Sequence, residues 1–184
     1  NKEINYDSLI LELKFICFPL SIWKNLQNSF VGNYLTIDNL YSSSYVRSIN
    51  YNNIFSDFKR KVVLDIGFRK SAITAFYENR ILYFNVLPVG GRHITNDISI
   101  LLKTSEEEAE KIKKNLNQSE ITFENKLDTN NKKESSNLSN QVIFARVDEI
   151  IKLNLADRYF NAFFSSEDRS ILIFIGEGSK ILNN

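Results

Sequence analysis

The spacing of apolar and polar residues predicts an α/β fold in which a mixed sheet is flanked by helices. Short apolar runs predict strands at five places: Leu9–Phe18, Val62–Ile66, Ala72–Tyr77, Arg80–Leu87 and Ser170–Ile175. Apolar residues at helical spacing predict four helices: Ser21–Asn33, Ile94–Leu102, Ser105–Lys114 and Gln141–Phe164. The segment Thr36–Ile49 fits a strand followed by a short helix, and the pattern leaves its state open.

Polar residues mark the connections between these elements. Glu78-Asn79 separates two predicted strands and is typical of a hairpin turn. Ser105 and Glu108 have the spacing of a capping box, which predicts a helix start at Ser105. Residues 115–140 are rich in Asn, Ser, Lys and Glu, and only Ile121–Phe123 could form a strand there. We therefore expect a polar, flexible loop at about 115–140.

The composition is that of a globular protein and excludes some partners. Apolar residues make up 43% of the 184 residues, and the net charge is +1. This balance gives no electrostatic reason to expect nucleic acid as a partner. Cys17, the single cysteine, lies in an apolar run, which favours a buried structural thiol over a reactive one. The absence of methionine and the end of the chain just after a glycine motif indicate a fragment.

Glycines end three of the predicted strands, and the first of these ends is a candidate phosphate site. Asp65 closes a buried strand, Gly67 follows in the turn, and Lys70 and Ser71 come next. The lysine could supply positive charge, and the serine and backbone N–H groups could donate hydrogen bonds to phosphate oxygens. An ordinary hairpin with an exposed lysine fits the same residues equally well.

The other two glycine turns follow Arg80–Leu87 and Ser170–Ile175. Gly90 and Gly91 connect a strand to a helix, and we expect them to shape that turn without binding a ligand. Gly176 and Gly178 form a Gly-x-Gly after a core strand, where a base or ribose could lie on the backbone. His93 is the only histidine and has no second ligand at metal-binding spacing, so no metal site and no catalytic residue are predicted.

The order of these pieces resembles the second half of the FtsA family, the bacterial cell-division members of the actin/Hsp70-like ATPase superfamily. Leu87–Ile98, followed by the Thr104–Lys113 helix start, carries the most specific likeness. Val63–Gly67 is similar to the second phosphate loop of the superfamily, and Ile175–Ser179 is similar to its adenosine motif. Ala145–Ile150 resembles the long helix before that motif.

The resemblance implies an incomplete actin-like (ribonuclease H-like) ATPase domain. Residues 1–40 would be a remnant of subdomain 1C, and residues 41–184 would form domain 2 with its 2A and 2B parts. The first phosphate loop of the family and the C-terminal amphipathic helix through which it binds membrane would lie outside this chain. Membrane attachment would depend on that helix alone.

The resemblance also implies a degenerate nucleotide site for ATP, with Mg²⁺ possible and binding weak. Its implied residues are Asp65, Gly67, Lys70, Ser71, Glu110, Lys113, Gly176 and Gly178. Phe68 and Arg69 stand where the family has glycines, and Glu177 replaces a glycine of the adenosine motif. These bulky residues oppose close approach of a ligand, and we expect no ATP hydrolysis by this chain. Helix capping explains the charges of Glu110 and Lys113 equally well.

The function that the resemblance implies is an adaptor. It would link FtsZ filaments to the cytoplasmic face of the cell membrane at the division septum, and it could self-associate into actin-like filaments. Arg146 matches a basic contact of the family with the FtsZ tail, although a solvated helix arginine is an equal alternative. The alternative functions are a working actin-like ATPase whose other half-cleft lies elsewhere, and a PilM-like pilus-assembly protein.

Overall fold

The computed structural model describes residues 13, 15–116, 131–164 and 168–182. The chain divides into two compact units, residues 1–41 and residues 42–184. That the first unit is a remnant of subdomain 1C stays a prediction. Among the described residues, no helix has the length and apolar character needed to cross a bilayer.

The described part of the first unit contains α1, Leu20–Val31, and no strand. Pro19 precedes the helix in an extended conformation, so the helix begins one residue before the predicted cap Ser21. The predicted strand is absent from residues 13 and 15–18, and its other residues lie outside the described part of the chain. Cys17 is exposed, which contradicts the prediction of a buried thiol. Residues 15–18 form no strand, so Cys17 is not part of a sheet in the described structure.

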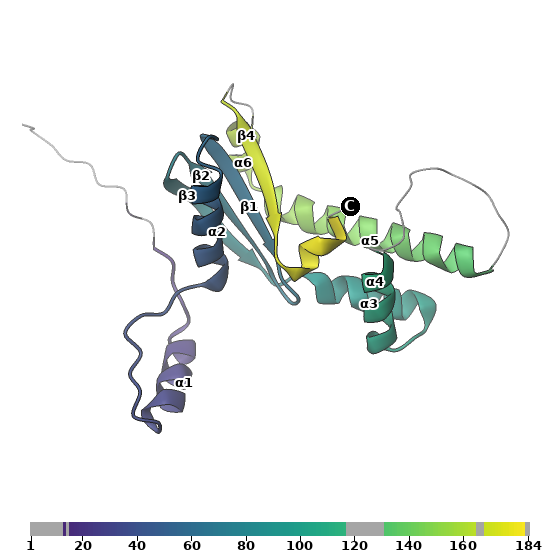
Figure 1. Ribbon diagram of the computed structural model, residues 1–184, viewed down its shortest axis with the longest axis horizontal. Helices are drawn as coiled ribbons and strands as arrows, with labels where there is room; N and C mark the ends of the chain where they lie inside the picture. The colour runs from purple at the N-terminus through teal and green to yellow at the C-terminus, as the bar shows by residue number, and fades with distance from the viewer. Residues whose placement is uncertain (1–12, 14, 117–130, 165–167, 183–184) are drawn as a thin grey trace, which may run out of the picture. The chain divides into compact units, whose positions relative to one another are not determined.

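The second unit is built on a four-stranded sheet with the order β3-β2-β1-β4 (Figure 1). Its strands are β1 (Arg60–Ile66), β2 (Ser71–Tyr77), β3 (Arg80–Leu87) and β4 (Ser170–Ile175). The first three form an antiparallel meander, and β4 pairs parallel to β1. Glu78 adopts a φ of 53° in the predicted hairpin turn between β2 and β3. The mixed sheet with flanking helices agrees with the predicted fold class.

One face of the sheet is covered by α2, Ser43–Ile54, which resolves the ambiguity of this segment in favour of a helix. Val63, Phe76 and Ile173 of the sheet form a buried cluster with residues of and just after this helix. A buried hydrogen bond of 2.9 Å from Thr74 Oγ1 to Ser48 Oγ fixes the helix on the sheet. Lys61 is fully buried in the described structure, and this burial lowers its pKa.

The opposite face carries the larger core and the remaining helices. These are α3 (Gly91–Leu102), α4 (Glu106–Leu116), α5 (Asn131–Leu155), α6 (Arg158–Phe164) and the 3₁₀ helix η1 (Glu177–Leu182). Ile94 and Ile98 of α3 and Ile150 of α5 are fully buried in this core. Ser105 Oγ accepts the Glu108 N–H at 3.2 Å, so the predicted N-cap of α4 forms.

Two features of this half differ from the sequence prediction. Residues 131–140 form the first turns of α5, although their polar composition predicts a loop. The predicted strand at Ile121–Phe123 lies outside the described residues. The helix predicted over Gln141–Phe164 is broken between α5 and α6, where the Phe160 N–H donates to the Asp157 carbonyl and starts a new helix. The break lets Phe160 and Phe163 enter the core, and Phe160 packs edge-on against Tyr83.

We expect Gly90→Ala to lower the free energy of unfolding by about 1–3 kcal/mol, because the added Cβ would lie 2.5 Å from the Gly67 carbonyl oxygen. Gly91→Ala is the matched control, since its Cβ would meet no atom closer than 3.6 Å. Urea denaturation of both variants measures the difference. Equal stabilities of the two variants would contradict the close approach of this turn to the loop after β1.

Candidate functional site

Three turns meet at the ends of β1, β3 and β4. The loop of residues 67–70 follows β1, the Gly90-Gly91 turn leads into α3, and the Gly176–Gly178 turn leads into η1. The Gly91 N–H donates to the Gly67 carbonyl at 2.9 Å, and the Arg92 N–H donates to the Phe68 carbonyl at 2.6 Å. The start of α3 is therefore fastened to the loop after β1 by two backbone hydrogen bonds.

The turn after β4 approaches the same loop so closely that it requires glycine. Gly176 has a φ of +91°, and a Cβ there would lie 2.4 Å from the Ile66 carbonyl oxygen. A Cβ on Gly178 would lie 2.7 Å from Ile66 Cγ2. Both positions therefore need glycine to keep η1 beside the end of β1.

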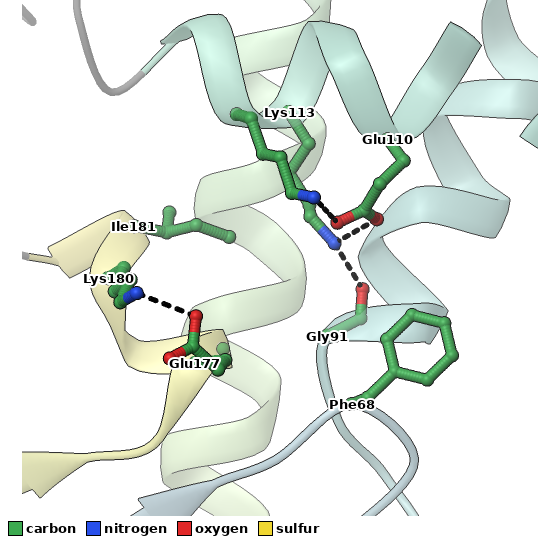
Figure 2. A pocket seen from close by; sticks show the side chains of 9 residues that line it. Phe68, Gly91, Glu110, Lys113, Glu177, Lys180 and Ile181 are labelled. Carbon is green, nitrogen blue, oxygen red and sulfur yellow. Dashed lines mark hydrogen bonds and ion pairs between the residues drawn. The ribbon is translucent and has the colours of Figure 1, made fainter. Parts of the chain in front are cut away.

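A pocket of about 550 Å³ lies where these turns meet α4 and η1 (Figure 2). Its volume is within the range of small-molecule sites, about 300–1,000 Å³. Its lining combines glycine backbone, two apolar side chains and five charged ones: Phe68, Gly91, Glu110, Lys113, Lys114, Glu177, Gly178, Lys180 and Ile181. The pocket thus offers both a flat backbone surface and polar groups to a ligand.

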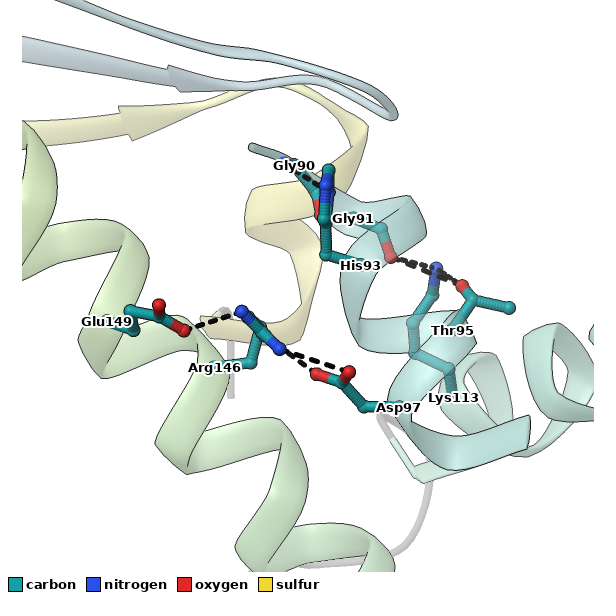
Figure 3. A network of polar contacts seen from close by, with 8 residues as sticks. All are labelled: Gly90, Gly91, His93, Thr95, Asp97, Lys113, Arg146 and Glu149. Carbon is teal, nitrogen blue, oxygen red and sulfur yellow. Dashed lines mark hydrogen bonds and ion pairs between the residues drawn. The ribbon is translucent and has the colours of Figure 1, made fainter. Parts of the chain in front are cut away.

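Lys113 is buried at the pocket wall and holds α4 against the start of α3. Its ammonium group donates to Gly91 O at 3.2 Å, to Thr95 Oγ1 at 2.7 Å and to Glu110 Oε2 at 2.5 Å (Figures 2 and 3). An ammonium group has three donors and no acceptor, so these partners use all of them. Lys113 therefore orders the wall of the pocket and has no donor left for a ligand.

Glu110 is the carboxylate on which this network converges. Burial by itself would raise its pKa, but hydrogen bonds from Lys113 and Thr95 and the charges of Lys113 and Lys114 lower the pKa overall. Glu110 is therefore ionised at neutral pH. Its Oε1 lies 3.6 Å from the Nζ of the exposed Lys114.

The cations that remain accessible in the pocket are Lys114 and Lys180. Their side chains are 71% and 61% exposed, whereas that of Lys113 is 7% exposed. Lys180 pairs with Glu177 at 2.7 Å and lowers the pKa of that carboxyl group. Glu177 itself is 82% exposed, so its side chain extends into solvent at the rim of the pocket.

The residues predicted for phosphate lie in different surroundings. Asp65 is nearly buried and is paired with Arg47 of α2. Ser71 is fully buried and accepts a hydrogen bond of 2.9 Å from the Asn154 side chain of α5. Lys70 is exposed on the loop. The structure brings Glu110, Lys113 and Gly178 to one pocket, with Gly67 and Gly176 behind it, and leaves Asp65, Lys70 and Ser71 outside its lining.

Arg146 lies on α5 and bridges to α3 (Figure 3). Its Nε donates to Asp97 Oδ2 at 2.7 Å and its Nη2 to Asp97 Oδ1 at 3.1 Å, which is a bidentate pair. Its Nη1 donates to Glu149 Oε2 at 2.6 Å. The hydrogen bonds that Arg146 donates to Asp97 raise the pKa of Arg146 further above its usual value. The side chain keeps 28% of its surface exposed.

His93 is used within its own turn. The Gly90 N–H donates to His93 Nδ1 at 3.1 Å, so the imidazole caps the start of α3 (Figure 3). In the described part of the chain, no group of three or more His, Cys, Asp or Glu side chains is arranged to hold a metal ion.

Sequence reasoning missed Arg47, Thr95 and the accessible lysines Lys114 and Lys180. Arg47 and Asp65 are eighteen residues apart and belong to different elements, so no local pattern connects them. Thr95 stands one turn into α3, at a spacing that is also typical of any helix start.

Comparison with known proteins identifies the family. A family model described as "Cell division protein FtsA" matches residues 62–183. The chain belongs to the FtsA family. This confirms the resemblance carried by the glycine turns, each of which lies within the matched range.

Curated relatives agree with this assignment. FtsA of Bacillus subtilis (strain 168) is 36% identical over 100 residues, which cover 50% of this chain and 23% of the relative. FtsA of Helicobacter pylori (strain J99) is 29% identical over 109 residues, which cover 58% of this chain and 21% of the relative. The chain thus spans about a fifth to a quarter of the length of these relatives.

Solved structures show that the fold is actin-like. A chain of the PilM–PilN type IV pilus biogenesis complex gives a TM-score of 0.63 at 16% identity. The match covers 88% of this chain and 42% of the chain in that complex. MreB5 of Spiroplasma citri, solved bound to ADP, gives a TM-score of 0.58 at 14% identity. The match covers 86% of this chain and 54% of the MreB5 chain. The fold class predicted from the sequence is therefore confirmed.

The residues of this chain fit the nucleoside part of a nucleotide but not a magnesium ion. Gly178 and Ile181 offer backbone and apolar surface, and Glu110 and Lys114 offer polar groups beside it. At the other side of the pocket stands Phe68, where a phosphate would need backbone N–H groups and open space. The carboxylate at the end of β1, Asp65, is already paired with an arginine.

We expect Glu110→Gln to lower the free energy of unfolding by about 1–3 kcal/mol at pH 7, because the ion pair with the buried Lys113 is lost. The pKa of Glu110 is lowered in the folded state, so its contribution is present above its unfolded pKa, about 4.3, and is lost as the pH falls through the folded value. The difference from the parent chain should therefore shrink in acid.

Urea denaturation at about pH 7 and about pH 3, on either side of the usual carboxyl pKa, measures this effect. The matched control is Glu106→Gln, whose partner Arg92 is exposed and 3.4 Å away. We expect its effect to be below about 0.5 kcal/mol. A stability difference for Glu110→Gln that does not change with pH would contradict the role of its charge.

Proposed function

We propose that this chain is part of an adaptor that links FtsZ filaments to the cytoplasmic face of the cell membrane at the division septum. Membership of the FtsA family is the observation that carries the proposal. The actin-like fold is consistent with self-association into filaments, which we include in the proposal. Membrane attachment would use a segment of the whole protein outside these residues.

The docking site that we propose for the FtsZ tail lies on the α3–α5 pair around Arg146. The guanidinium has five N–H donors, and three of them are engaged by Asp97 and Glu149. The remaining donors and the exposed part of the side chain could bind a carboxylate of a peptide. Leu101, four residues after Asp97 on the same side of α3, is 39% exposed and adds apolar surface.

A structural role for Arg146 is the competing explanation, because the bidentate pair already joins α5 to α3. The two roles differ in their response to loss of Asp97. If Arg146 contacts the peptide, Asp97→Asn frees its donors and binding persists. If Arg146 only holds the helices together, Asp97→Asn weakens binding as much as Arg146→Ala does.

Nucleotide binding is the second part of the proposal. We place a nucleoside in the pocket between α4 and η1, with Gly178 and Ile181 against the base and Glu110 and Lys114 near the ribose. Binding would be weak, since Lys113 has no donor to spare and Phe68 stands at the phosphate side. ATP hydrolysis is not proposed for this chain, because Asp65, the carboxylate at the end of β1, is already paired with Arg47.

The alternative of a PilM-like pilus protein has less support than the cell-division adaptor. The likeness to the PilM–PilN complex, at 16% identity, shows the fold alone. The family model and the curated relatives, in contrast, are all cell division proteins.

Titration of an FtsZ C-terminal peptide onto the chain tests the docking site. We expect Arg146→Ala to weaken binding by about tenfold, the loss typical of a contact to a charged group. Lys152→Ala is the matched control, because Lys152 is on the same helix, 74% exposed, and paired only with a neighbouring acid. It should bind as the parent chain does.

Asp97→Asn should also bind within about twofold of the parent chain. Unchanged affinity of Arg146→Ala would remove Arg146 from the docking site. Equal losses for Arg146→Ala and Asp97→Asn would assign Arg146 a structural role. Circular dichroism of each variant separates loss of binding from loss of the fold.

A further inference from the structure

Asp65 is the next-to-last residue of β1, at the end of the sheet that lies at the carboxyl terminus of this strand. Ligands bind beyond the carboxyl ends of the strands in open α/β folds, so a divalent cation would be expected near this carboxylate. The carboxylate lies beside the turn that leads into η1. A Cβ built on Gly176 would come within 2.5 Å of Asp65 Oδ1. The next two residues of that turn, Glu177 and Gly178, line the nucleotide pocket.

The Asp65 carboxylate is occupied by Arg47. Arg47 Nη1 lies 3.2 Å from Oδ1 and 3.3 Å from Oδ2, so one guanidinium nitrogen serves both oxygens. The Asp65 side chain is only 4% exposed, whereas that of Arg47 is 53% exposed. A carboxylate this deeply buried needs a permanent counter-charge, and an arginine provides one at every pH at which the protein folds.

Ser48, the residue after Arg47, fixes the position of α2 on the sheet. Ser48 Oγ accepts a hydrogen bond of 2.9 Å from Thr74 Oγ1 and donates one of 2.7 Å to Ser44 O, and all three residues are buried. Because Ser48 is fixed on β2, the residue before it is directed to the end of the adjacent strand β1. The Arg47–Asp65 pair is thus built into the packing of α2 on the sheet.

A divalent cation would compete with Arg47 for this carboxylate. Mg²⁺ is usually bound through one or two carboxylates together with ligand phosphates, so a free Asp65 carboxylate could serve as its protein ligand. The Arg47 guanidinium already contacts both oxygens of Asp65, so it competes with a cation for them and repels a second positive charge. The guanidinium also retains further N–H donors on its exposed side.

We propose that Arg47 takes the place of a divalent cation at the end of β1, and that this chain binds nucleotide without Mg²⁺. The ligand part of this inference rests on the nucleotide pocket proposed above, whereas the occupation of Asp65 by Arg47 does not. Arg47 is then the residue that determines metal dependence. Its guanidinium neutralises Asp65 and leaves positive charge facing the side from which phosphates would approach.

The test combines two titrations of the purified 184-residue chain. In the first, Mn²⁺ alone is added and free Mn²⁺ is followed by electron paramagnetic resonance. In the second, ATP is titrated calorimetrically in Mg²⁺ and again in EDTA. For the parent chain we expect no saturable Mn²⁺ binding, and ATP dissociation constants that agree within about twofold in the two buffers.

Arg47→Gln should reverse both results. Loss of the guanidinium leaves Asp65 free, so we expect Mn²⁺ binding to appear and ATP affinity to become at least about tenfold stronger in Mg²⁺ than in EDTA. The double variant with Asp65→Asn should lose the new Mn²⁺ binding. Arg69→Gln is the matched control, since Arg69 is an exposed arginine on the loop after β1, and it should behave as the parent chain does.

Arg47→Lys keeps the charge and should also show no Mn²⁺ binding, which provides a second variant if Arg47→Gln does not fold. Saturable Mn²⁺ binding to the parent chain that Asp65→Asn removes would overturn the inference. So would an ATP affinity of the parent chain that is about tenfold stronger with Mg²⁺. If ATP binds in neither buffer, the nucleotide pocket is wrong, and the Mn²⁺ titration still decides the role of Arg47.

Discussion

The second unit of this protein depends on the close backbone contact between the Gly90-Gly91 turn and the loop after β1. Two hydrogen bonds, from the Gly91 and Arg92 N–H groups to the Gly67 and Phe68 carbonyls, make this contact. The start of α3 is fixed by it, and the Gly91 carbonyl then accepts from Lys113 of α4. Both α3 and α4 are thereby positioned from one turn.

Close packing against the end of β1 and the loop after it requires glycine at three positions. Gly90, Gly176 and Gly178 are each too close to the backbone or side chains of residues 66–70 for a Cβ. Phe68 and Glu177 carry side chains into or beside the pocket, and Arg47 occupies the carboxylate at the end of β1. These turns therefore require glycine for packing, whether or not a ligand binds beside them.

Much of the fold follows from local pattern, and the site follows only in part. The apolar runs correctly predicted β1, β2, β3 and β4, because buried strands need continuous apolar residues. The break between α5 and α6 was not predictable, since it depends on the fit of Phe160 against Tyr83 in the core. The polar start of α5 was missed because composition indicated a loop there.

Local sequence pattern also predicted the candidate site only in part. Helix capping and ligand binding both account for Glu110 and Lys113 in the sequence, and only the geometry reveals that Lys113 has used its three donors within the protein. The partner of Asp65 lies on another element, so its identity required the packing of α2 on the sheet. Arg146 was located by family resemblance, whereas its bridge to Asp97 was visible only in the structure.

Amide hydrogen exchange tests the central contact most directly. The Gly91 and Arg92 amides lie at the start of α3, where a helix leaves its first N–H groups without partners inside the helix. If both donate to the loop after β1, they should exchange as slowly as the Leu64 amide in the centre of β1. Exchange of these two amides at the rate of an unprotected peptide would contradict the account, because the turn would then not be fastened to the loop.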